Sequence, residues 1–322
     1  MAQNIRGALV FNPGSGKGKA GERAKDFAEA WKNKFGSELL LRPTRSREDI
    51  RVAARETRAE GVVQIFMGGD GTLSESIQGL AEQSEFRPLT APIGLLPGGT
   101  GNSFLRDFGI TDYDSAKEAL LTALEAGSTI DVDSGIISYL ECTKEHPERG
   151  RPVQRITFNI WGIGLISNIT VLAVRMRFLG SLNYTLAALV KILTHRPDTL
   201  NVEIAGHPEQ LECNLITISN SRYTGGAMEI APEIRVNDGK LFLVCPQIKK
   251  RLQLLSTFPN IFKGGHVGNP AIRTQFIKEF KVTREDPFIM NVDGEVELGY
   301  DPTLKIHPGY FKIFMPADRL SS

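Results

Sequence analysis

Hydrophobic and polar positions follow two alternating patterns in the first third of the chain. Short apolar runs predict β-strands, and the segments between them carry apolar residues at helical spacing, as at 19–35. Glycine-rich turns follow three of the strands. Repeated strand, turn and helix predict a parallel, doubly wound α/β sheet, which binds ligands beyond the carboxyl ends of its strands. The predicted strands are 8–11, 38–41, 62–67 and 93–96.

Capping signals mark the start of two predicted helices. Ser46 and Asp49 form a capping-box pattern, and Gly61 stands where a glycine commonly follows a helix. Thr72 and Glu75 repeat the pattern, so we expect them to cap the helix after the third strand.

The pattern changes near residue 130, where strand-like runs begin to dominate. Many short strands with turn signals predict a β-sandwich-rich second domain. We place the domains at 1–133 and 134–322, and the last strand can return to the first domain. Helical spacing in the second part occurs near 166–178, 182–195 and 249–263, and one of its predicted strands is 275–282.

Charge and cysteine content exclude several classes of protein. The 322 residues carry 38 Lys and Arg against 37 Asp and Glu, a balance that disfavours a dedicated nucleic-acid binder. Three widely spaced cysteines disfavour a disulfide scaffold or a zinc site. The longest uncharged stretch, 156–174, is broken by polar residues and glycines, so we expect no membrane-spanning helix. We expect a cytoplasmic protein whose membrane contact is peripheral.

The first glycine-rich loop runs from Asn12 to Lys19. It lacks the spacing of a Walker A motif, and its G-x-G-x-x-G match at 16–21 is weak by itself. A flexible turn before a helix is the simpler alternative. The backbone N–H groups of small residues at a helix start also bind anions, which favours a phosphate-binding loop.

The second loop, 68–72, holds Asp70 among glycines. An acidic residue in an anion-binding turn would repel phosphate unless Mg²⁺ bridged the two, although an ordinary turn containing an aspartate is the alternative. The third loop, 97–102, has a similar composition. Three such loops at successive strand ends predict a polyphosphate site.

These loops and two later segments resemble the diacylglycerol kinase catalytic-domain family, which includes bacterial diacylglycerol kinases and the sphingosine and ceramide kinases. The G-G-D-G turn alone is less specific, since NAD kinases and phosphofructokinases carry similar turns. The resemblance implies an α/β nucleotide-binding domain, a β-sandwich-rich lipid-binding domain and an active site in the cleft between them. The similar segments, in family order, are 11–20, 68–80, 96–109, 219–244 and 291–295.

The resemblance also implies roles for individual residues. Asp70 would hold Mg²⁺ or orient the reacting groups, and Asp293 or Glu295, with Glu295 favoured, would be the base for the lipid hydroxyl. Ser74 stands where the family commonly has asparagine. The residues implied to bind ATP are Asn12, Pro13, Gly14, Ser15, Gly16, Thr44, Gly68, Gly69, Asp70, Gly71, Thr72, Leu73, Ser74 and Thr100.

A structural Mg²⁺ site is implied at the turn 235–240. Its ligands would be the carboxylate of Asp238 and the backbone carbonyl oxygens of Arg235 and Lys240. Asn237 replaces one acid of the family pattern, which lowers the negative charge of the predicted site.

The sequence therefore predicts a lipid kinase that uses ATP and Mg²⁺, with diacylglycerol as the favoured substrate and ceramide or a sphingoid base as the alternative. Two other classes stay open, a soluble-substrate kinase like NAD kinase and a nucleotide-binding module without catalysis. The predicted partners are a membrane lipid and the membrane surface, without nucleic acid. The segment 249–263 begins with three basic residues and has an apolar helical face, which fits core packing first and membrane contact second.

Overall fold

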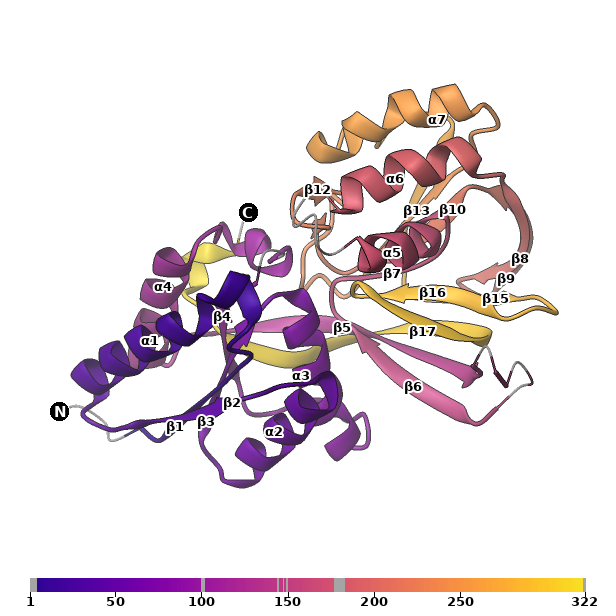
Figure 1. The fold of residues 1–322 in the computed structure, drawn as a ribbon. Coiled ribbons are helices and arrows are strands. Elements are labelled where there is room, and N and C mark those ends of the chain that lie inside the picture. Colours follow the sequence, from indigo (N-terminus) through magenta and orange to yellow (C-terminus); the bar gives the residue numbers. More distant parts are fainter. Residues whose placement is uncertain are drawn as a thin grey trace. The chain divides into compact units, whose positions relative to one another are not determined.

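A computed structural model describes residues 5–99, 102–143, 145–146, 148, 150–176 and 183–320, without the side chains of residues 17, 174, 183 and 184 (Figure 1). The chain forms two compact units. The first unit contains residues 1–132 and 309–322, and the second contains 133–308. The last segment of the chain therefore belongs to the first unit, and the second unit ends before it.

The first unit is a parallel sheet with helices on both faces (Figure 1). Its strand order is β2-β1-β3-β4, and the end of β17 (Glu295–Phe314) joins beside β4 in parallel. Helices α1 and α4 pack against each other, as do α2 and α3. The strands are β1 (Gly7–Phe11), β2 (Leu39–Pro43), β3 (Val63–Gly68) and β4 (Ile93–Pro97), and the helices are α1 (Ala20–Phe35), α2 (Arg47–Ala59), α3 (Asp70–Gln83) and α4 (Tyr113–Ala126).

The hydrophobic pattern explains this arrangement. On α1 the buried side chains include Phe27, Trp31 and Phe35, which recur at helical spacing and face the sheet. All five residues of β1 are buried, as expected for a strand covered by helices on both faces. The doubly wound fold predicted for this unit is confirmed.

One of the two predicted helix caps is correct. The backbone N–H of Asp49 donates to Ser46 Oγ at 3.1 Å, and Ser46 caps α2. The cap predicted at Thr72 and Glu75 is wrong, because the glycine turn lets α3 begin at Asp70 with Gly69 as the cap. The Glu75 side chain instead forms an ion pair with Arg51 of α2.

The second unit is built mainly of antiparallel strands. One run of paired strands is β14-β13-β10-β7-β16-β17, while β15 pairs with β17 and β8, and β5 pairs with β17 and β6. The strands are β5 (Thr129–Glu141), β6 (Pro152–Thr157), β7 (Ile160–Gly164), β8 (Asp198–Ile204), β9 (His207–Cys213), β10 (Leu215–Ser219), β11 (Tyr223–Thr224), β12 (Met228–Glu229), β13 (Leu241–Pro246), β14 (Ile272–Ile277), β15 (Glu279–Thr283) and β16 (Phe288–Val292). The predicted strand 275–282 is two strands, because β14 and β15 pair with different neighbours on either side of Lys278.

Two hydrophobic cores lie on opposite faces of β13. Leu241 and Leu243 point into one core with side chains from the other strands, and Phe242 and Val244 point into the second core with side chains from the helices. The helices are α5 (Leu165–Arg175), α6 (Asn183–Thr194) and α7 (Arg251–Thr257), and a 3₁₀ helix, η4 (Phe258–Lys263), follows α7. This second unit therefore has the β-sandwich character that was predicted. Of the helices that the structure describes, none is both long and apolar enough to cross a membrane.

Candidate functional site

The glycine loops after β1, β3 and β4 meet through their backbones. The N–H of Gly98 donates to the carbonyl oxygen of Gly68 at 2.8 Å, which joins the second and third loops. A Cβ atom on Gly99 would lie 2.8 Å from the Cα atom of Gly69, closer than real Cβ contacts come. A Cβ atom on Gly16 would collide with the carbonyl oxygen of Gly98. The structure therefore brings the three predicted loops together, and the contacts leave no room for side chains.

The first loop is closed by its own hydrogen bonds. Asn12 Oδ1 accepts the N–H of Gly14 at 2.9 Å, and the Asn12 carbonyl accepts the N–H of Ser15 at 3.0 Å. Pro13 lies between these partners, and a 3₁₀ helix begins at Ser15. Thr44 is buried after β2, and its N–H and Oγ1 both donate to the Phe11 carbonyl, at 2.8 and 3.2 Å. Thr44 thus fixes the end of β1, from which the loop starts.

Asp70 connects the second loop to the third. Its carboxylate accepts the N–H of Ser103 at 2.9 Å and the N–H of Phe104 at 3.2 Å, at the start of the 3₁₀ helix η2 (Phe104–Phe108). Burial raises the pKa of Asp70 above its usual range, and the hydrogen bonds oppose this shift. The Ser103 side chain also forms a hydrogen bond to this carboxylate. An ionised carboxylate can accept about four hydrogen bonds, so one lone pair is left for a cation.

The remaining predicted residues of the second loop form the first turns of α3. The N–H groups of Thr72 and Leu73 donate to the Gly69 carbonyl at 2.9 and 3.2 Å, with Gly71 in the same turn. Ser74 is buried, and its hydroxyl has no hydrogen-bond partner among the residues that the structure describes. Thr100, the last residue predicted to bind ATP, lies outside the described residues.

In the second unit, Asp293 and Gly294 form the turn of a β-hairpin. Val292 pairs with Glu295 across the turn, and the φ angles of Asp293 and Gly294 are 50° and 91°. Two successive residues with positive φ match the two-residue hairpin turn for which Asp-Gly is a preferred sequence. The predicted acids Asp293 and Glu295 therefore occupy the turn and the first position of β17.

The carboxylate of Asp293 is enclosed by four donors from one segment. Thr157 Oγ1 donates at 2.8 Å, and the N–H groups of Phe158, Asn159 and Ile160 donate at 3.3, 3.1 and 2.9 Å. Burial raises the pKa of Asp293 to about 6, although these hydrogen bonds lower it. Asp293 therefore holds the hairpin in place, while Glu295 is buried two residues away.

The turn predicted to hold a structural Mg²⁺ is closed by hydrogen bonds. The Asp238 carboxylate accepts the N–H of Arg235 at 3.4 Å and the N–H of Lys240 at 3.0 Å. The Arg235 carbonyl accepts the N–H of Asp238 at 3.3 Å. One carboxylate and backbone carbonyls are thus present, and lone pairs on them remain for a cation. Within the described part of the chain, no group of three His, Cys, Asp or Glu side chains could hold a metal.

Sequence reasoning missed a polar network beside these two turns. The carboxylate of Asp133 accepts the N–H of Gly239 at 2.6 Å, and Asn220 Nδ2 donates to the Asp133 carbonyl at 2.8 Å. The Ser221 hydroxyl donates to Asn159 Oδ1 at 2.5 Å. The only sequence signal was the Ser-Asn-Ser run at 219–221, which belongs to one of the similar segments.

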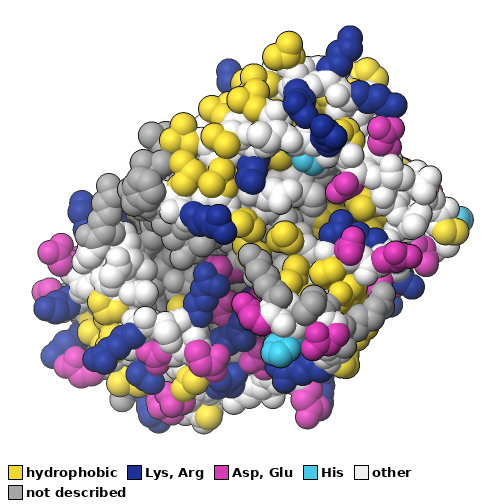
Figure 2. Space-filling model, turned by 45° about the vertical axis from the view of Figure 1, so that its right-hand side comes forward, with side chains coloured by type: hydrophobic (Ala, Val, Ile, Leu, Met, Phe, Trp, Pro, Cys, Tyr) yellow, Lys and Arg dark blue, Asp and Glu magenta, His cyan; other side chains and the backbone are white. Residues whose placement is uncertain are grey.

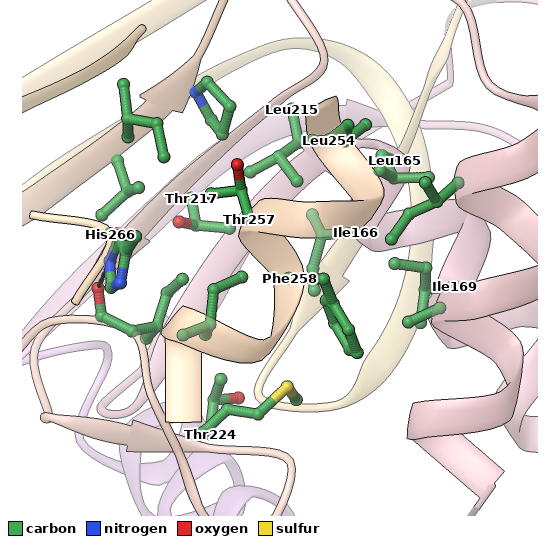
Figure 3. Close-up of a pocket in the computed structure, with 18 of the residues that line it drawn as sticks. Leu165, Ile166, Ile169, Leu215, Thr217, Thr224, Leu254, Thr257, Phe258 and His266 are labelled. Atoms are coloured by element: carbon green, nitrogen blue, oxygen red, sulfur yellow. Dashed lines mark hydrogen bonds between the residues drawn. The ribbon is translucent and has the colours of Figure 1, made fainter. Parts of the chain in front are cut away.

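An apolar pocket in the second unit was also missed. It contains about 810 Å³ of space between α5, α6, α7 with η4, and the strands β7, β10 and β13, counting the part that is open to solvent. Figure 3 shows Ile166, Ile169 and Leu165 on one side of it and Thr217 and His266 on the other.

Two buried polar groups face this apolar lining. Thr217 Oγ1 and His266 Nδ1 have no hydrogen-bond partner in the described residues, and His266 Nε2 lies 2.9 Å from the Ile230 carbonyl oxygen. Burial lowers the pKa of His266, so the ring is neutral at neutral pH. The pocket is therefore an uncharged, mainly hydrocarbon surface, and Thr217 and His266 contribute its two buried polar atoms that lack a partner in the described residues.

Two protein families together match most of the chain. Residues 6–136 match the diacylglycerol kinase catalytic domain, and residues 161–315 match the YegS C-terminal NAD kinase beta sandwich-like domain. The first match contains the three glycine loops, and the second contains the hairpin, the turn 235–240 and all of the pocket lining except Ile160.

Individual relatives match over nearly their whole length. A diacylglycerol kinase of Mycobacterium tuberculosis is 27% identical over 311 residues, which are 95% of this chain and 94% of that protein. A diacylglycerol kinase of Bacillus subtilis is 27% identical over 296 residues, 90% of this chain and 89% of that protein. The crystal structure of a diacylglycerol kinase from Bacillus anthracis has the same fold, with a TM-score of 0.68 and 18% identity over 97% of both chains. Residues 6–136 are therefore a diacylglycerol kinase catalytic domain, and the chain is a lipid kinase, a phosphotransferase with an alcohol group as acceptor.

Proposed function

We propose that the protein transfers the γ-phosphoryl group of ATP to the free hydroxyl of diacylglycerol and produces phosphatidate. The pocket of the second unit is the observation that carries this proposal. Its lining is almost entirely hydrocarbon, so it favours an acyl chain over a charged, water-soluble substrate such as NAD. The relatives named diacylglycerol kinase favour this lipid over ceramide or a sphingoid base, which also carry long hydrocarbon chains.

The proposed nucleotide site is the set of glycine loops in the first unit. Backbone N–H groups at the ends of β1, β3 and β4 would bind the phosphates, and the close backbone contacts keep the loops in one geometry. Asp70 would hold Mg²⁺ with the lone pair that Ser103 and Phe104 leave free. When bound, Mg²⁺ supplies positive charge that offsets the charge of the transferring phosphoryl group.

We assign proton acceptance to Glu295 and positioning to Asp293. All four donors around Asp293 come from its own unit and occupy the lone pairs of its carboxylate, which leaves little room for a substrate hydroxyl to bind there. Glu295 is the first residue of β17, the strand that follows the hairpin turn. Replacing Glu295 by Gln should lower kcat by roughly 10²–10⁴-fold with little change in the KM for ATP, and should remove the acidic limb of the pH–rate profile. A wild-type profile in that variant would exclude Glu295 as the base.

A lipid panel with labelled ATP tests the proposed reaction. Diacylglycerol, ceramide, sphingosine and NAD are each supplied in turn, and we expect labelled phosphatidate to be the main product. Main labelling of ceramide, sphingosine or NAD would contradict the proposed substrate.

A pocket variant connects this activity to the second unit. Ala188 of α6 lines the pocket, so Ala188→Phe should fill part of it and raise the KM for long-chain diacylglycerol. The KM for ATP is the internal control and should stay unchanged. An unchanged KM for the lipid would place the acyl chain elsewhere.

A further inference from the structure

The helices of the second unit lie in two stretches of sequence without acidic residues. No Asp or Glu occurs between Glu148 and Asp198 or between Asp238 and Glu279, although the chain contains 37 acidic residues. All of α5, α6, α7 and η4 fall within these stretches. These four helices therefore carry basic but no acidic side chains, even though the chain as a whole has a net charge of only +1.

The outer faces of α6, α7 and η4 are apolar as well as basic. On α6, Ala188 and Ile192 are buried and line the pocket, whereas Val190 and Leu193 on the other face are 51% and 53% exposed. On α7, Leu252 is 78% exposed. Most of the large hydrophobic side chains that are exposed in the described residues belong to these elements, namely Leu186, Leu189, Val190, Leu193, Leu252 and Phe262.

Basic side chains surround these apolar residues. Lys249 pairs with Glu212 at 3.2 Å, and Arg251 Nε donates to the His195 carbonyl at 3.1 Å. Lys250 and Lys263 are exposed, and no described residue forms an ion pair with either of them. Figure 2 shows hydrophobic side chains gathered in its upper part, where α6 and α7 lie, with Lys and Arg side chains among them.

We propose that this face, the outer side of α6 together with residues 249–263, docks on an anionic phospholipid bilayer. Exposed apolar side chains with basic side chains among them are the composition of an interfacial helix surface. None of these helices carries an acidic residue that would repel anionic lipid, and Glu212 beside them is paired with Lys249. The same helices line the pocket with Ala188, Ile192 and Leu254, so docking would bring bilayer lipid to the pocket wall.

Docking on the bilayer does not depend on which lipid the protein phosphorylates. Only the further step, in which docking delivers the lipid substrate to the pocket, rests on the proposed function. Binding is therefore measured without ATP, by co-sedimentation with phosphatidylcholine vesicles that contain or lack phosphatidylglycerol. We expect binding to the anionic vesicles that weakens as salt is added. Equal binding to both vesicles, or binding to neither, would overturn the proposal.

Charge variants locate the surface. Each basic residue at an anionic surface contributes about fivefold to the binding constant, so Lys250→Ala with Lys263→Ala should weaken vesicle binding by about 25-fold. The control, Lys278→Ala with Lys281→Ala, removes the same charge beside and within β15 and should leave binding unchanged. Equal losses in both double variants would show that net charge, and not this face, drives the binding.

Apolar variants test the other half of the surface. Leu193→Ser with Leu252→Ser should weaken binding to anionic vesicles more than tenfold, because both side chains would enter the interface. Leu40→Ser, a 46% exposed position on β2, is the matched control and should bind normally. Normal binding by the double variant would overturn the proposal. The proposal would also be overturned if light scattering showed that the wild type is a dimer and that the double variant is a monomer, because a second copy of the chain would then cover this face.

An activity assay separates this inference from the proposed reaction. The apolar double variant should phosphorylate short-chain diacylglycerol in detergent at the wild-type rate and lose activity on diacylglycerol in vesicles. Equal activity of the variant and the wild type on vesicles would overturn the docking face. A wild-type protein that binds anionic vesicles but phosphorylates diacylglycerol in neither assay would contradict the proposed reaction and leave the docking face in place.

Discussion

Asp70 and Asp293 are both aspartates beside a glycine in a tight turn, but the two turns are built in opposite ways. In the first unit, backbone contacts between glycines hold the loops together, and Asp70 accepts two N–H groups from the third loop. In the second unit, the Asp293 carboxylate accepts four hydrogen bonds and itself fixes the hairpin. Both carboxylates are buried, but that of Asp70 keeps a lone pair for a cation, whereas all four hydrogen-bonding positions of Asp293 are occupied.

The largest effect should come from Asp70, because it has the capacity to act on the nucleotide. Asp70→Asn keeps one oxygen acceptor and the turn, so we expect a folded protein that loses about 1–2 kcal/mol of stability. Its kcat should fall by roughly 10²–10⁴-fold, the scale for losing one charge-positioning group. Thermal melting and steady-state kinetics measure the two effects. A folded variant with near wild-type turnover would restrict Asp70 to the structural role that its hydrogen bonds to Ser103 and Phe104 already show.

The sequence predicted the first unit better than the second, and the reason is physical. Helices such as α1 and strands such as β1 are specified by local periodicity, and the predicted and observed limits differ by one or two residues. The cap at Thr72 was mispredicted because glycine turns allow several helix starts, and packing selects one. In the second unit, the break at Lys278 depends on which strands pair, which no local pattern encodes.

In the candidate site, too, the features with a local sequence signal were predictable and those formed by distant residues were not. The glycine loops were predictable because glycine itself is the signal for close backbone approach. The enclosure of Asp293 was not, because its donors lie at 157–160, far away in the sequence. The pocket was missed for a similar reason, since its lining comes from separate helices and strands whose apolar residues look like ordinary core.

The second effect, in order of size, is the pH dependence of stability that Asp293 causes. Its folded pKa of about 6 lies above the unfolded value of 3.8, so the folded state binds the proton first. The contribution of Asp293 to stability is therefore fully present below about pH 4 and is lost as the pH rises through 6. Asp293→Asn should abolish this dependence, since Asn does not titrate and tolerates positive φ.

The measurement is the free energy of unfolding of both proteins between pH 4 and pH 7. The difference between wild type and variant should change by up to roughly 3 kcal/mol across that range, with the wild type gaining stability toward acid. Other titrating groups cancel in the difference. Parallel curves would show that the donors at 157–160 hold the pKa near its unfolded value, and Asp293 would then resemble a solvated carboxylate.

A third, smaller effect should come from the backbone contact between the loops. Gly99→Ala places a Cβ atom 2.8 Å from the Cα atom of Gly69, so the loops must separate. We expect a loss of about 1–3 kcal/mol in stability and a raised KM for ATP. Gly21→Ala is the control, because it meets no atom within 4 Å at the start of α1 and should stabilise the helix by up to about 1 kcal/mol. If Gly99→Ala matched this control in melting temperature and KM, close loop packing would not be what organises the site.

The smallest effect should come from Asp238, whose turn combines both designs, a glycine for the bend and a carboxylate that accepts two N–H groups. Asp238→Ala removes two hydrogen bonds at a partly exposed turn, so the direct loss should be about 1 kcal/mol. If Asp238 also holds Mg²⁺, adding Mg²⁺ without nucleotide should raise the Tm of the wild type and leave the variant unchanged, because a ligand that binds only the folded state stabilises it. Ca²⁺ and a chelator complete the titration. If Mg²⁺ raised the Tm of both proteins equally, the cation would bind at another carboxylate. Asp238 would then stabilise its turn through hydrogen bonds alone, as Asp293 stabilises the hairpin.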